Sequence, residues 1–145
     1  MYQHILIATD GSQLAGKAVA AGFGLARALG ARVTAVTVTE PWAALVTGEA
    51  AFGFPVDEYN KSADESASRI LAGVSSLARK ADIQCTTLHA KDQYPAEGIL
   101  DTANNNHCDL IVMASHGRRG LSRLLLGSQA VRVLTNSTIP VLICR

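Results

Sequence analysis

Two glycines and a hydroxyl in the last third of the chain have a spacing that suits phosphate binding. Gly117 and Gly127 bracket nine residues, and Ser128 follows directly. Backbone N–H groups at the start of a helix favour a polyphosphate, and the helix macrodipole adds to the attraction. Glycine lets the main chain approach such a ligand closely and adopt a positive φ. The spacing alone leaves a second interpretation open, in which Gly117 and Gly120 form a turn and Gly127 permits close helix packing.

The same loop contains His116, which can titrate near neutral pH. The partners of a catalytic site are missing, because no Ser-His-Asp order, close pair of carboxylates or metal-ligand cluster accompanies it. His4, His89 and His107 are scattered through other segments. We therefore expect structural roles for all the histidines and assign no catalytic residue. The chain also has no Walker A lysine motif and no G-x-G-x-x-G after its first strand, so P-loop hydrolysis and dinucleotide binding are poor fits.

Alternating strands and helices are expected to position this loop. Apolar runs rich in β-branched residues predict strands, and these are His4–Thr9, Arg32–Thr39, Ile83–His89, Leu110–Met113 and Pro140–Cys144. Apolar residues at helical spacing predict helices, and these are Gln13–Leu29, Glu58–Lys80, a helix from Tyr94 to the run Asn104–Asn106, and Leu121–Thr135 apart from Gly127.

Cap residues mark the ends of the expected helices. Ser12 is the expected N-cap of the first helix and Gly30 its stop, and Asp57 is the expected cap of the second helix. The buried face of that second helix is predicted to be Ala63, Ala67, Ile70, Val74 and Leu77. Residues 40–55 hold prolines and glycines without a clear period, which is typical of a functional or mobile loop.

The order of these elements predicts a single α/β domain over residues 1–145. Strands that alternate with helices favour a doubly wound, mostly parallel five-stranded sheet with helices on both faces. Such sheets bind ligands beyond the carboxyl ends of the strands, where the strand order reverses. Asp10 and the loop from Ala114 to Gly120 should both lie on that edge.

Composition narrows the class of protein. The chain has 145 residues, 48% of them hydrophobic, and a net charge of +1. This charge predicts no general affinity for nucleic acid or acidic membranes, and no apolar run is long enough to cross a bilayer. The N-terminus lacks the basic region of a signal peptide, so we expect a cytoplasmic protein. Cys85, Cys108 and Cys144 lie far apart and are expected to be buried or partly buried thiols.

Four segments together resemble the universal stress protein family over the whole chain. They are Ile5–Ser12, Asp109–Leu121, Leu125–Ser128 and Ile139–Ile143. The resemblance implies a Rossmann-like fold of the adenine nucleotide alpha hydrolase-like type. The family's ATP-binding branch carries glycine, two residues, glycine, nine residues, then glycine with serine or threonine. Here Ala114 stands in place of the first glycine, and we expect weaker or repositioned binding rather than its loss.

By this match the ligand is ATP, and Mg²⁺ would reach Asp10 with it. The implied contacts are Ala8, Thr9, Asp10, Val38, Met113, Ala114, Gly117, Arg118, Arg119, Gly127, Ser128 and Gln129. Asp10 would accept hydrogen bonds from the ribose hydroxyls, or else end its strand as an Asx-turn. Val38 would contact the adenine, or else belong to the core. Arg118 and Arg119 would neutralise phosphate charge, or else face solvent.

Three functions remain open at this point. The leading one is a stress-response regulator or sensor whose conformation depends on bound adenine nucleotide. The alternatives are a slow ATPase or phosphotransferase that uses the same pocket, and a nucleotide-free, chaperone-like dimer. The resemblance and the uncovered apolar strand Pro140–Cys144 both predict a homodimer formed through that strand.

Overall fold

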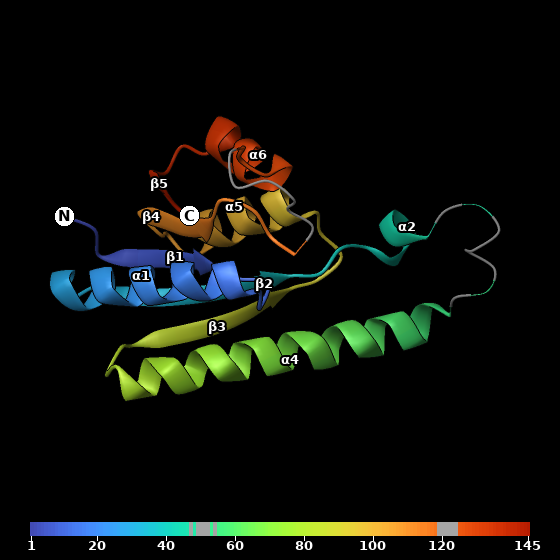
Figure 1. The fold of residues 1–145 in the computed structure, drawn as a ribbon, viewed down its shortest axis with the longest axis horizontal. Coiled ribbons are helices and arrows are strands. Elements are labelled where there is room, and N and C mark those ends of the chain that lie inside the picture. Colours follow the sequence, from blue (N-terminus) through green and yellow to red (C-terminus); the bar gives the residue numbers. More distant parts are fainter. Residues whose placement is uncertain (47, 49–52, 54, 119–124) are drawn as a thin grey trace.

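The computed structural model describes residues 1–46, 48, 53, 55–118 and 125–145. The strands are β1 (His4–Ala8), β2 (Arg32–Val38), β3 (Cys85–Ala90), β4 (Leu110–Ala114) and β5 (Val141–Cys144). The helices are α1 (Gln13–Leu29), α2 (Trp42–Leu45), α4 (Val56–Lys80), α5 (Pro95–Asn105) and α6 (Ser128–Asn136). Figure 1 shows their arrangement.

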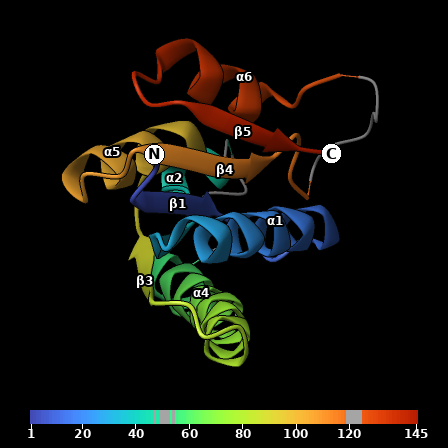
Figure 2. The same ribbon diagram turned by 90° about the vertical axis from the view of Figure 1, so that its left-hand side faces the viewer.

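The strands form one sheet in the order β3-β2-β1-β4-β5, and every pair is parallel. Helices α1 and α4 cover one face, and α5 and α6 cover the other (Figures 1 and 2). This confirms the predicted doubly wound α/β fold. The chain runs outward from β1 through β2 to β3 and then returns to β4 on the other side of β1. The strand order therefore reverses between β1 and β4.

The core follows from the alternation of side chains along the strands. In β1, Ile5 and Ile7 pack with the α1 and α4 side, whereas Leu6 and Ala8 pack with the α5 and α6 side. Every residue of β1 and β4 is buried. The two strands that flank the reversal are thus covered on both faces, as their continuous apolar runs predicted.

The caps of α1 are as predicted. The Ser12 side chain accepts a hydrogen bond from the backbone N–H of Ala15 at 3.1 Å. Gly30 ends the helix in the left-handed conformation with φ of 65°. The cap of α4 is different, because this helix begins at Val56 after Pro55, and Asp57 lies in its first turn. A carboxylate in the first turn still stabilises the helix through its dipole.

The buried face of α4 was predicted only in part. Ala67 and Val74 are buried as expected, but Leu77 is 51% exposed. The buried stripe continues through Leu71 and Ala78 instead. The second half of the helix therefore turns a neighbouring face toward the sheet.

Several element boundaries also differ from the predictions. The last helix begins at Ser128, because Gly127 has extended dihedrals and donates its N–H to Ser115 O at 2.7 Å. Residues 121–124 of that expected helix lie outside the described part of the chain. Strand β3 begins at Cys85, since the N–H of Ile83 closes the last turn of α4 on Ala78 O. The segment expected to be a loop contains the short helix α2.

The cysteines and the lengths of the helices bear on two expectations drawn from composition. Cys108 is buried and Cys85 and Cys144 are partly buried, all three as free thiols, as predicted. None of the helices in the described residues is long and apolar enough to cross a membrane.

Candidate functional site

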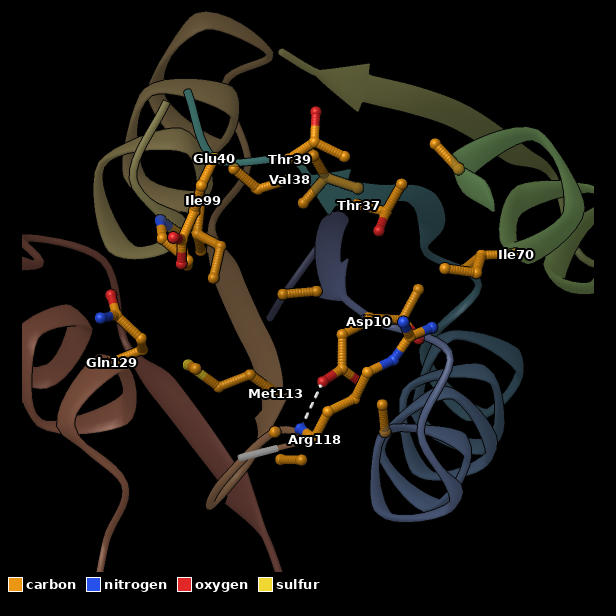
Figure 3. Close-up of a pocket in the computed structure, with 18 of the residues that line it drawn as sticks. Asp10, Thr37, Val38, Thr39, Glu40, Ile70, Ile99, Met113, Arg118 and Gln129 are labelled. Carbon is orange, nitrogen blue, oxygen red and sulfur yellow. Dashed lines mark hydrogen bonds between the residues drawn. The ribbon is translucent and has the colours of Figure 1, made fainter. Parts of the chain in front are cut away.

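A cavity of about 550 Å³ opens where the carboxyl ends of β1, β2 and β4 meet. Its volume lies in the usual range for small-molecule sites, roughly 300–1,000 Å³. Figure 3 shows side chains from several elements converging on it. The predicted contacts that line it are Ala8, Thr9, Asp10, Val38, Met113, Ala114, Gly117, Arg118, Gly127, Ser128 and Gln129. Arg119 lies outside the described residues.

Asp10 joins the first turn to the loop after β4. Its Oδ1 accepts a hydrogen bond from Ser12 N at 2.9 Å, and its Oδ2 accepts one from Arg118 N at 2.9 Å (Figure 3). Burial alone would raise the pKa of this carboxyl, but the hydrogen bonds from Ser12 and Arg118 outweigh burial and hold the pKa below its usual value. The Asx-turn is therefore present. Each carboxylate oxygen has a second lone pair, so a ligand hydroxyl can still donate to Asp10.

Gly117 and Gly127 stand where a side chain would collide with the protein itself. A Cβ at Gly117 would lie 2.6 Å from Asp10 Oδ2, and a Cβ at Gly127 would lie 3.1 Å from Ser115 O. Gly127 has a φ of −64°, and Gly117 is not among the described glycines with positive φ. The expectation of positive φ was wrong at both positions. Their lack of a side chain lets the loop after β4 lie against Asp10 and against the start of α6.

The N-terminus of α6 opens into the cavity. Ser128, Gln129 and Ala130 form its first turn and line the cavity. The cap residue Gly127 has no side chain to accept their N–H groups. Among the described residues no acceptor is recorded for these three N–H groups. The first turn of α6 therefore offers the cavity donors and the positive end of the helix dipole.

The end of β2 presents its main chain to the same cavity. Thr9 N donates to Val36 O at 2.9 Å, and β1 then ends. Backbone groups alternate in direction along a strand. Val38 therefore directs its N–H and C=O toward the side that β1 has left, since Thr39 N turns the other way and donates to Ala90 O. In the described part of the chain no partner is recorded for this donor and acceptor, which face the cavity beside the Val38 side chain.

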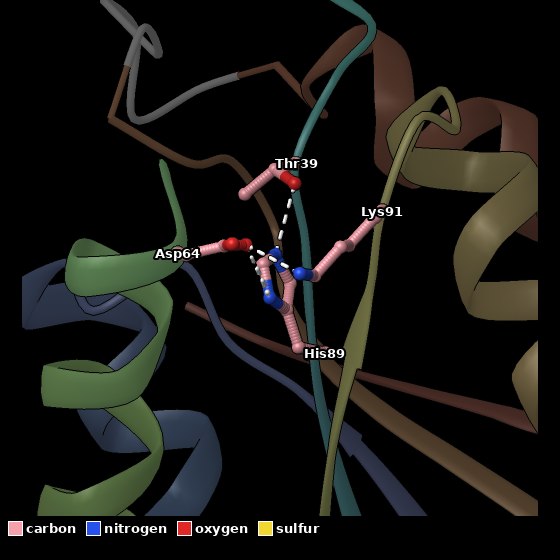
Figure 4. A network of polar contacts seen from close by, with 4 residues as sticks. All are labelled: Thr39, Asp64, His89 and Lys91. Carbon is pink, nitrogen blue, oxygen red and sulfur yellow. Dashed lines mark hydrogen bonds and ion pairs between the residues drawn. The ribbon is translucent and has the colours of Figure 1, made fainter. Parts of the chain in front are cut away.

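A polar network holds this end of β2 against its neighbours (Figure 4). Thr39 Oγ1 and His89 Nε2 lie 2.9 Å apart in a hydrogen bond. Asp64 of α4 contacts His89 Nδ1 at 3.6 Å and Lys91 Nζ at 2.7 Å. Burial first, and Lys91 second, lower the pKa of His89 below 6.5. The imidazole is therefore mainly neutral at pH 7; it hydrogen-bonds to Thr39 at the end of β2 and lies beside Asp64 of α4.

Several other residues that line the cavity were not predicted as contacts from the sequence. Helix α4 contributes Tyr59, Ser62, Ser66 and Ile70. These residues recur every three or four positions, so the spacing puts them on one face of the helix without showing what that face contacts. The hydroxyls of Tyr59, Ser62 and Ser66 are typical of a solvent-exposed face, whereas Ile70 belonged to the face predicted to be buried. Glu40 and Ile99, from the end of β2 and from α5, also line the cavity, and only the tertiary fold brings them there.

Three more residues have defined positions, namely the last residue of β4 and two residues of the loop that follows it. Ala114 is a buried strand residue paired with Cys144. Its conformation is not among the positive-φ exceptions of the described residues. Arg118 extends its guanidinium over the turn at Gly11, beside Ile70. His116 Nδ1 pairs with Ser115 Oγ at 3.0 Å, and the residue lines the cavity.

The comparisons with known proteins agree with one another. The model of the universal stress protein family matches residues 1–145. The universal stress protein YxiE of Bacillus subtilis is 32% identical, and the alignment covers all of both chains. The solved structure of MJ0577, a universal stress protein of Methanocaldococcus jannaschii, superposes with a TM-score of 0.85 at 25% identity. That superposition covers 99% of this chain and 96% of the other.

Two further solved structures share the fold and contain nucleotides. A universal stress protein in complex with cAMP has a TM-score of 0.71 at 23% identity, over 98% of this chain and 95% of its own. A universal stress protein of Archaeoglobus fulgidus in complex with dAMP has a TM-score of 0.71 at 21% identity, over 99% of this chain and 98% of its own. The family model and the full-length relative show that the chain is a member of the universal stress protein family.

Proposed function

We propose that this protein binds an adenine nucleotide, ATP above all, in the cavity between β1 and β4, and that the bound nucleotide regulates its conformation during the stress response. The observation that carries the proposal is the first turn of α6, whose N–H groups face the cavity without an acceptor among the described residues. Such a turn is well suited to hold phosphate. The Ser128 hydroxyl adds a further donor.

The remaining walls suit the rest of a nucleotide. The free main-chain donor and acceptor of Val38 match the edge of a base that has one acceptor and one donor, as adenine does. Asp10 lies between the part of the cavity at Val38 and the part at the first turn of α6, and its carboxylate has lone pairs left for ribose hydroxyls. Relatives of the same fold bind cAMP and dAMP, which supports adenine as the base.

Regulation is favoured over catalysis because the Asp10 carboxylate already has a structural role. Both oxygens of Asp10 already accept backbone hydrogen bonds that join two loops. If Mg²⁺ enters with ATP, Asp10 is the carboxylate beside the phosphate loop that would bind it, and the ion would neutralise phosphate charge. A ligand that touches Asp10, Gly117 and α6 together links three separate segments, which is how binding would change the conformation.

The sharpest test of the phosphate position is Ser128→Asp. A carboxylate in the first turn stabilises the helix but repels phosphate. We expect the affinity for ATP to fall at least tenfold, on the order of the loss of one charge-assisted contact, with unfolding unchanged or slightly improved. Ser68→Asp is the matched control, because Ser68 is an exposed residue of α4 that does not line the cavity.

Calorimetry measures both variants, and mass spectrometry of the denatured wild type identifies any nucleotide retained through purification. Equal ATP affinity in Ser128→Asp and Ser68→Asp would contradict the phosphate position. A wild type that binds no adenine nucleotide would refute the function as a whole. Release of ADP by the bound protein would indicate the slow ATPase instead of the regulator.

A further inference from the structure

We propose that Glu40 selects the base of the bound nucleotide, with its carboxylate accepting a hydrogen bond from the 6-amino group of adenine. The inference rests on the proposed function and adds a specificity determinant to it. Glu40 follows directly after the end of β2 and lines the cavity half-buried. In Figure 3 it lies with Val38, Thr39 and Ile99, at the end of the cavity away from Arg118.

The carboxylate of Glu40 is an acceptor that the protein itself leaves open. Among the described residues, no hydrogen bond or ion pair is recorded for this side chain. An ionised carboxylate accepts hydrogen bonds and cannot donate them. It also repels phosphate, so its end of the cavity suits the uncharged base, whereas the phosphates suit Gly117 and the first turn of α6.

The main chain around Glu40 is held on several sides. Tyr59 of α4 donates its hydroxyl to Glu40 O at 2.6 Å. The preceding residue, Thr39, donates its N–H to Ala90 O at 2.9 Å and accepts from Gln93 N at 3.3 Å. Its hydroxyl pairs with His89 (Figure 4). The backbone that carries Glu40 is therefore fixed, which keeps the carboxylate at this end of the cavity.

The chemistry separates adenine from hypoxanthine. Adenine carries an amino group at position 6, which donates, whereas hypoxanthine carries a carbonyl oxygen there, which accepts. With the base placed against the Val38 main chain, an amino group would meet the Glu40 carboxylate as a donor. A carbonyl oxygen would place two acceptors together, and the carboxylate would lose its hydration without gaining a partner.

The test compares ATP with inosine triphosphate, which differs at this part of the base and has the same ribose and phosphates. We expect the wild type to prefer ATP by about tenfold or more, the discrimination typical of a direct contact to a base edge. Glu40→Gln can donate as well as accept, so the ratio of the two affinities should fall by about threefold or more from the wild-type value, while the Val38 main chain, which faces the same edge of the base, keeps part of the preference. The affinity for ATP should decrease while that for inosine triphosphate increases.

Glu97→Gln is the matched control, because Glu97 is exposed on α5 near the cavity and does not line it. Its ratio should equal that of the wild type. Glu40→Ala should also reduce the preference, through weaker ATP binding alone. A wild type that binds both nucleotides equally, or a Glu40→Gln variant whose preference is undiminished, would overturn this inference and leave adenine-nucleotide binding intact. A wild type that binds neither nucleotide would refute both proposals, and that result is distinct from the other two.

Discussion

Asp10 combines a structural role with the proposed contact to the nucleoside. Asp10→Ala removes the acceptor for Ser12 N and Arg118 N. We expect the free energy of unfolding to fall by about 1–3 kcal/mol, as for hydrogen bonds to a charged group, and ATP affinity to fall as well. Urea unfolding and calorimetry measure the two effects.

The stability effect of Asp10 should depend on pH with a definite sign. The folded-state pKa lies below 3.8, so the ionised form is favoured by folding. Its contribution is present above pH 3.8 and is lost as the pH falls through the folded pKa. The difference between wild type and Asp10→Ala should therefore shrink in strong acid. A difference that grew below pH 3.8 would contradict the assignment.

His4 provides a second pH dependence, in a milder range. Its Nε2 pairs with Thr34 Oγ1 at 2.8 Å, and its buried Nδ1 has no partner among the described residues. Burial first, and then the positive charge of Arg32, lower its pKa below 6.5. Protonation is therefore easier in the unfolded chain, so stability should fall as the pH drops below about 6.5.

His4→Gln keeps a hydrogen-bonding side chain without titration. Thermal unfolding between pH 7.5 and 5 should show a smaller loss of stability in this variant than in the wild type. An identical pH profile in both proteins would show that His4 does not cause the loss.

At the scale of elements, the junction between β4 and α6 depends on Gly127. A Cβ there would lie 3.1 Å from both Ser115 O and His116 Cβ, closer than an ordinary contact. Gly127→Ala should therefore destabilise the protein by about 1–3 kcal/mol, the range for overpacking. Gly127→Val should cost more, so loss of nucleotide binding in that variant would report a displaced loop as well as a blocked phosphate.

The control for Gly127→Ala is Gly16→Ala, in an open position of α1 where no atom lies within 4 Å of the added Cβ. That change should stabilise the protein by about 0.5–1 kcal/mol, because alanine is the better helix former. Urea unfolding of both variants separates the two outcomes. Equal effects of the same sign would contradict the steric argument at Gly127.

At the scale of the whole molecule, we expect a homodimer formed through the edge strand β5. The strand lies at the end of the sheet beside β4, and Leu142 is 41% exposed. Val141 and Ile143 pack against the core on the α5 and α6 side, so a lysine there would also damage the fold. Leu142→Lys places the charge outside that core and should shift a dimer toward monomer.

Light scattering at tens of micromolar measures the association. Leu134→Lys is a control, because Leu134 is similarly exposed at 40% but lies on α6. A monomeric wild type, or a Leu142→Lys variant that remains dimeric, would exclude β5 as the contact.

The sequence alone determined the order of the elements and the edge of the sheet that carries the site. Continuous apolar runs such as Leu110–Met113 can be satisfied only where a strand is buried on both faces, and that requires helices on each side. Asp10 and Gly117 follow two such strands, so their meeting follows from the topology. Local interactions also determined the caps of α1, since Ser12 and Gly30 form their capping hydrogen bonds within the first and last turns of that helix.

Only the tertiary structure decided which side chains complete the cavity and why its glycines are needed. Glu40 and the polar face of α4 have no local signal that separates a cavity wall from a solvated surface. The spacing singled out Gly127, although the expected helix Leu121–Thr135 enclosed it; glycine is needed there because of the contacts with Ser115 and His116, which no spacing can reveal. Such features depend on the distance between segments far apart in sequence, and that distance is set by packing of the whole domain rather than by any one stretch of chain.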